Sequence, residues 1–408
     1  MSSIFNKVTA ILFALLFSYQ VLYIIVSLLY KKKQEKAEIS YHNYAILICA
    51  RNEQQVIGQL LESINNQSYP GEYRTAFVMA DNCTDDTAET ARYYGAEVYT
   101  RYNTQLIGKG YALEELLRHI ERDYGDVFDG FLIIDADNIL KQDYLEKMNE
   151  SFCRGHKIIT GYRNSKNFDS NWISAGYSLW FLRENRFLNK ARYLLGLSCA
   201  VSGTGFLFSK EILQHWNYHS LTEDLEFTVD QICAGNKIAY CEDAVLYDEQ
   251  PQKFIQSFHQ RLRWAKGFIQ IFQKYSGKLV KGIVRGDFSC FDMLNTIVSA
   301  YGLSMLTLFI NIITLTWLII NRDSLHPFFM SLAVNVIRAY LCLFIVGLLT
   351  TICEWKHIRS SAWNKIRYTF TFPLFMATYI PIAFWALFAD VTWKPIQHTV
   401  TMSHENAA

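Results

Sequence analysis

The chain has 408 residues, of which 51% are hydrophobic and 19% charged, and its net charge at pH 7 is +1. This balance gives no support for a nucleic-acid-binding protein, which usually carries a basic excess. The distribution of charge is more informative, because residues 41–285 mix polar and apolar side chains while both flanks are apolar and nearly uncharged. We therefore predict a water-soluble region between membrane segments.

The first apolar segment, residues 8–30, carries no charge and is followed by Lys31, Lys32 and Lys33. About 20 apolar residues are enough to cross a bilayer. A cleavable signal peptide fits less well, because the lysines follow the segment and no small-residue cleavage site comes after it. Lysine clusters mark the cytosolic side of a span, so we predict a transmembrane helix within residues 1–33, with the amino terminus outside and the next domain in the cytosol.

The water-soluble region alternates short apolar runs, typical of buried strands, with segments whose apolar residues recur at helical spacing. We expect strands at residues 44–50, 76–80, 97–99 and 130–134, and helices at residues 56–64, 84–94 and 109–122. The alternation indicates an α/β fold with a mostly parallel sheet, in which ligands bind beyond the carboxyl ends of the strands. No Gly-x-Gly-x-x-Gly or phosphate-loop motif appears, which counts against dinucleotide cofactors and ATPases.

Three of these strands run directly into polar residues that should gather at one edge of the sheet. They are Arg51-Asn52-Glu53, Asp81-Asn82 and Asp135-Ala136-Asp137. Asp135 and Asp137 could hold Mg²⁺, which prefers oxygen ligands and often bridges to a diphosphate, although Asp-x-Asp is also common in solvated turns. Asp81 could accept hydrogen bonds from a nucleobase or serve only as a helix cap.

Two later positions suggest phosphate binding and proton transfer. Lys109, between Gly108 and Gly110 at a helix start, could meet a phosphate as a point charge, or it could be a solvated lysine. Asp224 in the segment Thr222-Glu223-Asp224 could be a general base. The alternative is an ordinary helix start, with Thr222 as the cap and acidic residues in the first turn.

The segment Gln260-Arg261-Leu262-Arg263-Trp264 ends an amphipathic stretch that suits a membrane interface. It also suits a diphosphate site, because Arg263 could neutralise a leaving group and Trp264 could stack on a sugar ring. The two roles are compatible.

Three further apolar segments follow, at residues 293–320, 328–352 and 368–387. The loop between the last two is rich in lysine and arginine, which agrees with a cytosolic position. Arg338 lies inside the second segment and should face protein or water, not lipid. Pro373 and Pro381 interrupt the third segment, which is therefore either a full span or a re-entrant helix that returns the carboxyl terminus to the cytosol.

Each motif is weak alone, but their joint order is distinctive: Arg-Asn-Glu, Asp, Gly-Lys, Asp-Ala-Asp, Gly203-Thr204-Gly205, Thr-Glu-Asp and Gln-x-x-Arg-Trp, then membrane spans. This order resembles the family 2 inverting glycosyltransferases with a GT-A fold, the group of cellulose, hyaluronan, chitin and poly-N-acetylglucosamine synthases. The resemblance covers about residues 44–267. It implies a cytosolic GT-A domain at 41–253, interfacial helices at 254–290, about three spans at 291–390 and a tail at 391–408, in a multi-pass protein of the plasma membrane.

The resemblance also implies a role for each motif residue. The residues that would bind the UDP-sugar donor are Ala50, Glu53, Asp81, Lys109 and Asp135. Asp137, with Asp135, would hold Mg²⁺ or Mn²⁺. The residues that would line the acceptor path are Ser202, Gly203, Thr204 and Gly205. Asp224, with Glu223 beside it, would be the base, and the diphosphate and the acceptor end would be bound by Gln260, Arg263 and Trp264.

The implied reaction is a metal-dependent, inverting transfer of a sugar, and we favour a processive enzyme that makes a β-linked polysaccharide. A non-processive lipid glycosyltransferase is the nearest alternative, because Gln-x-x-Arg-Trp occurs in both groups and the chain has fewer spans than many synthases. A third hypothesis is an inactive membrane protein that binds nucleotide-sugars. The segment from Trp393 to Thr399 loosely resembles the gating segment of some synthases, a role that needs a cytosolic carboxyl terminus.

Overall fold

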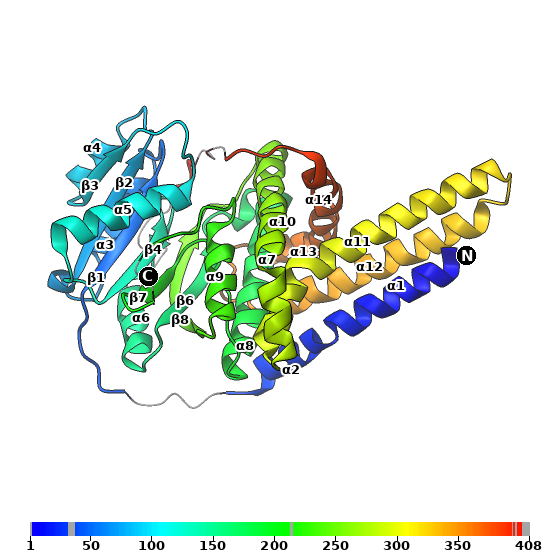
Figure 1. Cartoon of the computed structure of the whole chain (residues 1–408), viewed down its shortest axis with the longest axis horizontal. Coiled ribbons are helices and arrows are strands. Elements are labelled where there is room, and N and C mark those ends of the chain that lie inside the picture. The colour runs from blue at the N-terminus through cyan, green and yellow to red at the C-terminus, as the bar shows by residue number, and fades with distance from the viewer. Residues whose placement is uncertain (1, 32–36, 213–214, 394, 396–397, 402–408) are drawn as a thin grey trace. The chain divides into compact units, whose positions relative to one another are not determined.

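The structure is a computed structural model, which describes residues 2–31, 37–212, 215–393, 395 and 398–401 (Figure 1). Two of the lysines predicted to follow the first span, Lys32 and Lys33, therefore lie outside the described residues. The chain forms two compact units. The first, which we call the helical unit, consists of Met1–Tyr30, Asp169–Leu188 and Gln252–Val391. The second, which we call the sheet unit, consists of Lys31–Phe168, Asn189–Pro251 and Thr392–Ala408.

The sheet unit is built on one eight-stranded sheet with the strand order β3-β2-β1-β4-β7-β6-β8-β5. Its strands are β1 Tyr44–Ala50, β2 Arg74–Asp81, β3 Glu97–Arg101, β4 Gly130–Asp135, β5 Ile139–Leu140, β6 Ile158–Ser165, β7 Phe206–Ser209 and β8 Ile238–Asp248. Strands β3, β2, β1 and β4 are parallel, β7 is antiparallel to both β4 and β6, and β6 is parallel to β8. The predicted α/β fold with a mostly parallel sheet is confirmed.

Helices flank this sheet and complete its core. They are α3 Ile57–Asn65, α4 Thr87–Tyr93, α5 Lys109–Tyr124, α6 Tyr144–Cys153, α8 Lys190–Leu194 and α9 Glu223–Cys233, with a 3-10 turn at Gly71–Tyr73. Side chains of β1 such as Ile46 and Ile48 are fully buried, as expected for a continuous apolar run that is covered on both faces. The helix that we predicted from Thr84 begins instead at Thr87, because Asp85 Oδ1 accepts hydrogen bonds from the backbone N–H (3.2 Å) and hydroxyl (2.6 Å) of Thr87.

The helical unit contains the apolar helices. They are α1 Ser2–Phe17, α2 Tyr19–Leu29, α7 Trp172–Arg183, α10 Phe254–Val284, α11 Phe288–Ile320, α12 His326–Cys353, α13 Ala362–Ala377 and α14 Tyr379–Phe388. A 3-10 turn at Phe168–Ser170 and a π-helix at Glu184–Asn189 flank α7. Helices α13 and α14 separate at Thr378, because Pro381 has no N–H to donate to the carbonyl of Ala377.

Three stretches among the described residues are long and apolar enough to cross a membrane. They are Lys7–Leu29, His326–Cys353 and Ala362–Phe388. The span predicted at residues 293–320 falls in α11, where the side chains of residues 299–301 and 303–304 lie outside the described part, between the apolar stretches Phe288–Val298 and Met305–Ile320. Arg338 is exposed on α12, so it does not face protein within this chain, which was one of its two expected surroundings.

Gly110 in α5 gives a test of packing in the sheet unit. A Cβ atom on Gly110 would lie 2.0 Å from the backbone oxygen of Tyr218, a clash that no side-chain rotation relieves. We expect Gly110→Ala to lower the free energy of unfolding by about 1–3 kcal/mol. In the control Gly71→Ala the new Cβ atom would lie 4.0 Å from Arg74 Nη2, so stability should hardly change. Thermal unfolding of both variants measures this, and equal midpoints would contradict the packing that we describe.

Candidate functional site

The carboxyl ends of β1, β2 and β4 meet at one edge of the sheet, as predicted, because Ala50 pairs with Ala80 and Cys49 with Asp135. Asparagines follow two of these strands with positive φ, Asn52 at 59° and Asn82 at 52°. Asparagine tolerates this conformation when its side chain bonds locally. Asn52 Oδ1 accepts a hydrogen bond from Thr84 N at 2.8 Å, and Asn82 Oδ1 accepts one from Asn103 N at 2.9 Å. Backbone of this kind is often concentrated at functional sites.

Asp81 is buried at the end of β2, and one of its carboxylate oxygens already accepts hydrogen bonds from neighbouring side chains. Its Oδ1 accepts hydrogen bonds from Arg101 Nη1 at 2.7 Å and from Asn82 Nδ2 at 2.9 Å. Burial raises the pKa of Asp81, although the Arg101 guanidinium opposes that shift. Within the described residues no hydrogen bond reaches Oδ2 of Asp81, so this oxygen is available as an acceptor. Nearby Ala50 is buried, and its carbonyl accepts a hydrogen bond from Cys83 Sγ at 3.4 Å.

Lys109, Asp135, Gly203 and Asp224 come together from four different segments of the sheet unit. Lys109 Nζ pairs with the Asp135 carboxylate and donates to the backbone oxygen of Gly203 at 2.8 Å. Burial lowers the pKa of Lys109, but Asp135 and Glu223 outweigh that effect and leave the pKa above its ordinary value. A Cβ atom on Gly203, whose φ is +84°, would lie 3.6 Å from Asp224 Oδ2. The predicted base therefore lies beside Gly203, the residue whose carbonyl accepts the hydrogen bond from Lys109.

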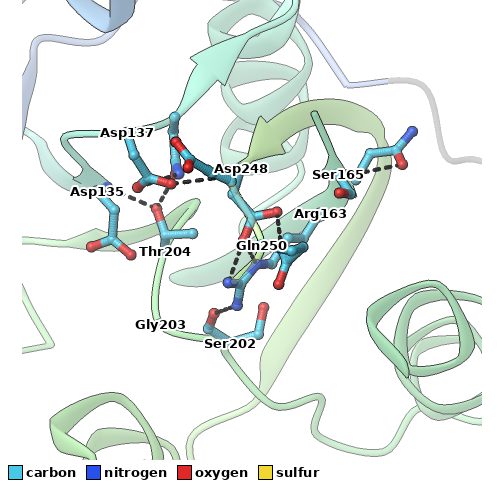
Figure 2. Close-up of polar contacts among 12 residues, drawn as sticks. Asp135, Asp137, Arg163, Ser165, Ser202, Gly203, Thr204, Asp248 and Gln250 are labelled. Atoms are coloured by element: carbon cyan, nitrogen blue, oxygen red, sulfur yellow. Dashed lines mark hydrogen bonds and ion pairs between the residues drawn. The ribbon is translucent and has the colours of Figure 1, made fainter. Parts of the chain in front are cut away.

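The segment Ser202 to Gly205 is held against the end of β4 (Figure 2). Thr204 Oγ1 accepts a hydrogen bond from Asp135 N at 2.9 Å and donates one to Asn138 Oδ1 at 2.6 Å. The backbone oxygen of Ser202 accepts a hydrogen bond from Arg163 Nη1 at 2.6 Å. These bonds fix the predicted acceptor segment next to the predicted donor residues.

Arg163, Asp248 and Gln250 belong to the same network but were missed by the sequence analysis (Figure 2). Asp248 Oδ2 accepts a hydrogen bond from Arg163 Nε, and Asp248 Oδ1 accepts one from Gln250 Nε2, both at 2.6 Å. Burial raises the pKa of Asp248 to about 6. A signal was present, because Asp248 ends β8 as Asp81 ends β2 and Asp135 ends β4.

The carboxyl-terminal segment also reaches this edge of the sheet. His398 Nδ1 lies 2.9 Å from Glu53 Oε1, and burial opposes protonation of His398 while Asp137 and Glu53 favour it, raising its pKa to about 10. Burial raises the pKa of Glu53 to about 7. Glu249 Oε2 accepts hydrogen bonds from Thr399 N at 2.9 Å and Val400 N at 2.8 Å.

The Arg51 guanidinium lies 5.4 Å from the centre of the Trp393 ring, so a second contact ties this segment to a strand end. In the sequence, the segment from Trp393 to Thr399 is linked with the site only through a loose resemblance to a gating segment. Of that segment, residues 394, 396 and 397 lie outside the described part of the chain.

The acidic residues at this edge suit a divalent cation that arrives with a ligand. Asp137 is 6% exposed, and its Oδ2 accepts a hydrogen bond from Glu249 N at 2.9 Å. Burial would raise the pKa of Asp137, but His398 and Lys166 hold it below its ordinary value. In the part of the chain that the structure describes, no three His, Cys, Asp or Glu side chains are grouped to enclose an ion. Mg²⁺ is often held by one or two carboxylates together with substrate phosphates, and the oxygen donors of Asp135 and Asp137 fit that arrangement.

The remaining predicted residues, Gln260, Arg263 and Trp264, lie on α10 in the helical unit, three and four positions apart and thus on one side of the helix. The Trp264 ring packs edge-to-face on Tyr177, with centres 5.7 Å apart. Gln260 Oε1 is buried and has no hydrogen-bond partner among the described residues. That these side chains join Asp137 and Asp224 around one ligand stays a prediction.

Arg261, for which the sequence predicted no role, is buried, with only 2% of its surface exposed. Its Nη1 donates to the backbone oxygen of Phe375 at 3.1 Å and to Thr378 Oγ1 at 2.8 Å. Its guanidinium also lies 4.6 Å from the centre of the Phe375 ring. Arg261 therefore connects α10 to the end of α13.

The chain has the fold of the GT-A glycosyltransferases. Residues 42–267, more than half of the chain, match the family described as "Glycosyltransferase like family 2". The protein belongs to that family.

Relatives of the chain are named for different products. The beta-monoglucosyldiacylglycerol synthase of Synechocystis sp. is 24% identical over 256 residues, which are 59% of this chain and 51% of that protein. This chain therefore spans about half the length of that relative. A poly-beta-1,6-N-acetyl-D-glucosamine synthase of Staphylococcus epidermidis is 23% identical over 334 residues, 78% of this chain and 77% of that protein.

A solved structure confirms the fold. The mannosyltransferase PcManGT of Pyrobaculum calidifontis, solved with GDP-Man and Mn²⁺, is similar with a TM-score of 0.54 and 16% identity, covering 93% of this chain and 99% of that one. At this identity the likeness shows the GT-A fold of the chain.

Proposed function

We propose that the protein transfers a hexose from a UDP-sugar to an acceptor hydroxyl, with inversion and with a divalent metal, on the cytosolic side of the plasma membrane. The observation that carries this proposal is the position of the Asp224 carboxylate beside Gly203, whose carbonyl accepts a hydrogen bond from Lys109. A candidate base and a cationic side chain thus lie next to the same residue, as transfer from a diphosphate donor requires.

The donor's nucleotide would bind along the ends of β1, β2 and β4. Asp81 Oδ2 would accept the N–H of uracil, because Oδ1 is already committed to Arg101 and Asn82. Lys109 would form charge-assisted hydrogen bonds to the diphosphate, which would draw it from its pair with Asp135. Mg²⁺ or Mn²⁺ held by Asp137 and Asp135 would supply positive charge to the phosphate oxygens of the departing UDP.

The transfer step needs a general base and a stabilised leaving group. Asp224 would take the proton of the acceptor hydroxyl as its oxygen attacks the anomeric carbon. The bond from that carbon to the UDP oxygen breaks in the same in-line displacement, so an α-linked donor gives a β-linked product without a covalent enzyme intermediate. Lys109 and, on α10, Arg263 would stabilise the charge that develops on UDP.

The acceptor is either a growing polysaccharide, which we favour, or a lipid. The relatives include both a polymer synthase and a glucolipid synthase, and the second of these supports a lipid as the alternative acceptor. Purified protein should be incubated with UDP-glucose, UDP-N-acetylglucosamine, UDP-galactose or UDP-glucuronate and Mg²⁺ or Mn²⁺, and UDP release and product length should be measured. Long products support processive synthesis, and a single sugar on lipid supports the alternative. No UDP release with any donor would refute both.

His398 should matter for donor binding, because it places a cation beside the carboxylates of Glu53 and Asp137. Without the positive charge of His398, the negative charges of Glu53 and Asp137 would repel the diphosphate more strongly. A hydrogen bond to a charged group contributes about 1.5–3 kcal/mol, so we expect His398→Ala to raise KM for the donor by roughly tenfold or more.

A second histidine–glutamate pair provides the matched control. His357 Nδ1 lies 2.7 Å from Glu354 Oε2 in the helical unit. His357→Ala should leave KM for the donor unchanged, and steady-state kinetics with varied UDP-sugar compares the two variants. An unchanged KM in His398→Ala would rule out a role of the carboxyl-terminal segment in donor binding.

A further inference from the structure

Helix α10 has a face that the proposed transfer reaction does not use. Its buried side packs against neighbouring helices, since Leu262 and Ala265 form one apolar cluster with Ile382 and Ala386 of α14. A Cβ atom on Gly282 would lie 2.3 Å from Cys290 Sγ, so the end of α10 also approaches α11 closely. The opposite side is exposed over the last three turns of the helix.

The charge of this part of the chain is one-sided. Between Glu249 and Asp287 there are eight lysines and arginines and no acidic residue. Because the whole chain has a net charge of only +1, the rest of the chain is net acidic. Such a concentration of positive charge in one segment indicates that this segment binds a negatively charged partner.

Four of these basic residues lie on one face. Lys274, Lys278, Lys281 and Arg285 follow one another at four-, three- and four-residue steps, and all four are exposed. We call them the basic stripe. The Nζ atoms of Lys274 and Lys278 lie 5.3 and 5.0 Å from the centre of the buried Tyr275 ring, which helps to hold the two stems against the helix.

Exposed apolar side chains accompany the basic stripe. Val280 is 49% and Val284 83% exposed on the same helix. Basic residues beside exposed apolar ones are typical of a helix that lies in a membrane interface, with its charges at the lipid headgroups. A protein or nucleic-acid partner would not explain the exposed valines as well.

The chain's own connections place the basic stripe near the membrane. Only residues 285–287 separate α10 from α11, so the stripe ends within about 15 Å of the first turn of α11. Figure 1 shows α10 running across the direction that α1, α11 and α12 share. Two of the candidate spans are formed by α12 and by the helices at the amino terminus. If these helices cross the bilayer, α10 lies along its surface.

We propose that the basic stripe of α10 selects anionic phospholipids, with phosphatidylglycerol-type headgroups as the partner. The lysine ammonium groups would pair with headgroup phosphates while Val280 and Val284 insert between acyl chains. Each basic residue near an anionic bilayer surface raises membrane affinity by about fivefold, so even partial engagement of four residues gives measurable lipid selectivity. This property is separate from sugar transfer and does not require the enzyme to be active.

The test uses the full chain reconstituted in phosphatidylcholine bilayers with trace spin-labelled lipid. Electron spin resonance should show spin-labelled phosphatidylglycerol associating with the protein several-fold more than spin-labelled phosphatidylcholine. The variant K274Q/K278Q/K281Q should lose most of this preference, and 1 M salt should weaken it, because the screening length there falls to about 3 Å.

A control variant removes the same charge elsewhere. K157Q/K210Q/K237Q changes three lysines of the sheet unit that pair with Glu211, Asp126 and the backbone of Gly196. This control should keep the lipid preference. Equal association of both spin labels with the unmodified protein, or a preference that survives in K274Q/K278Q/K281Q, would overturn the proposal.

Discussion

Asp224→Asn should reduce sugar transfer by about 10²–10⁴-fold, the range that general acid–base catalysis contributes. Asparagine keeps the size of the side chain but cannot take the proton of the acceptor hydroxyl. Because Asp224 lies at the start of α9 beside Gly203 and not among the residues proposed to hold the nucleotide, KM for the donor should change little. The loss should therefore appear in kcat, measured as UDP release and as product formed.

Asp126→Asn is the matched control, because the Asp126 side chain is 87% exposed and forms a surface ion pair with Lys210. It should keep full activity. Should Asp224→Asn retain more than a tenth of the rate while folding normally, the base must be another residue, and Glu223 would be the next to replace.

Asp137→Asn should abolish metal-dependent donor binding and, with it, transfer. Asp137 is the more buried of the two carboxylates proposed as metal ligands, and its pKa is below the ordinary value, so it is ionised at neutral pH. Neutralising it removes a charge that would hold the cation on the donor phosphates. Metal assistance of this kind is worth several kcal/mol, which corresponds to a loss of about 10³-fold in kcat/KM.

Calorimetric titration with UDP in the presence and absence of Mn²⁺ measures this effect directly. For the unmodified protein, Mn²⁺ should strengthen UDP binding and EDTA should remove that gain. For Asp137→Asn, UDP should bind equally with and without Mn²⁺. A variant that still responds to Mn²⁺ as the unmodified protein does would show that Asp137 is not a ligand.

Much of the fold could be predicted because its signals are local. The run Tyr44–Ala50 is apolar throughout, and a short run of this kind is typical of a strand covered on both faces. Once β1, β2 and β4 are parallel neighbours, their carboxyl ends must meet, and so Asp81 and Asp135 lie at the same edge. The shared edge of these residues followed from the geometry of parallel sheets, whereas the role of each site residue was implied by the family resemblance and stays a prediction.

The parts of the site that could not be predicted depend on tertiary placement. Asp248 reaches Arg163 because β6 and β8 pair beyond an antiparallel strand, and the local sequence of β8 does not encode that neighbour. His398 meets Glu53 across 345 positions of the chain, and no periodicity links the two. Local patterns also missed Arg261, because it stands at an unspecified position of Gln-x-x-Arg-Trp and its partners Phe375 and Thr378 are more than 100 residues away in the sequence.

The hydrogen bonds of Arg261 couple the position of α10 to that of α13. The Arg261 guanidinium is fastened to Phe375 and Thr378, where α13 ends and α14 has not yet begun. A shift or tilt of α13 would therefore be transmitted to the turn of α10 that carries Gln260, Arg263 and Trp264. If the candidate span Ala362–Phe388 crosses the bilayer, a change in bilayer thickness would reach those three side chains through this contact.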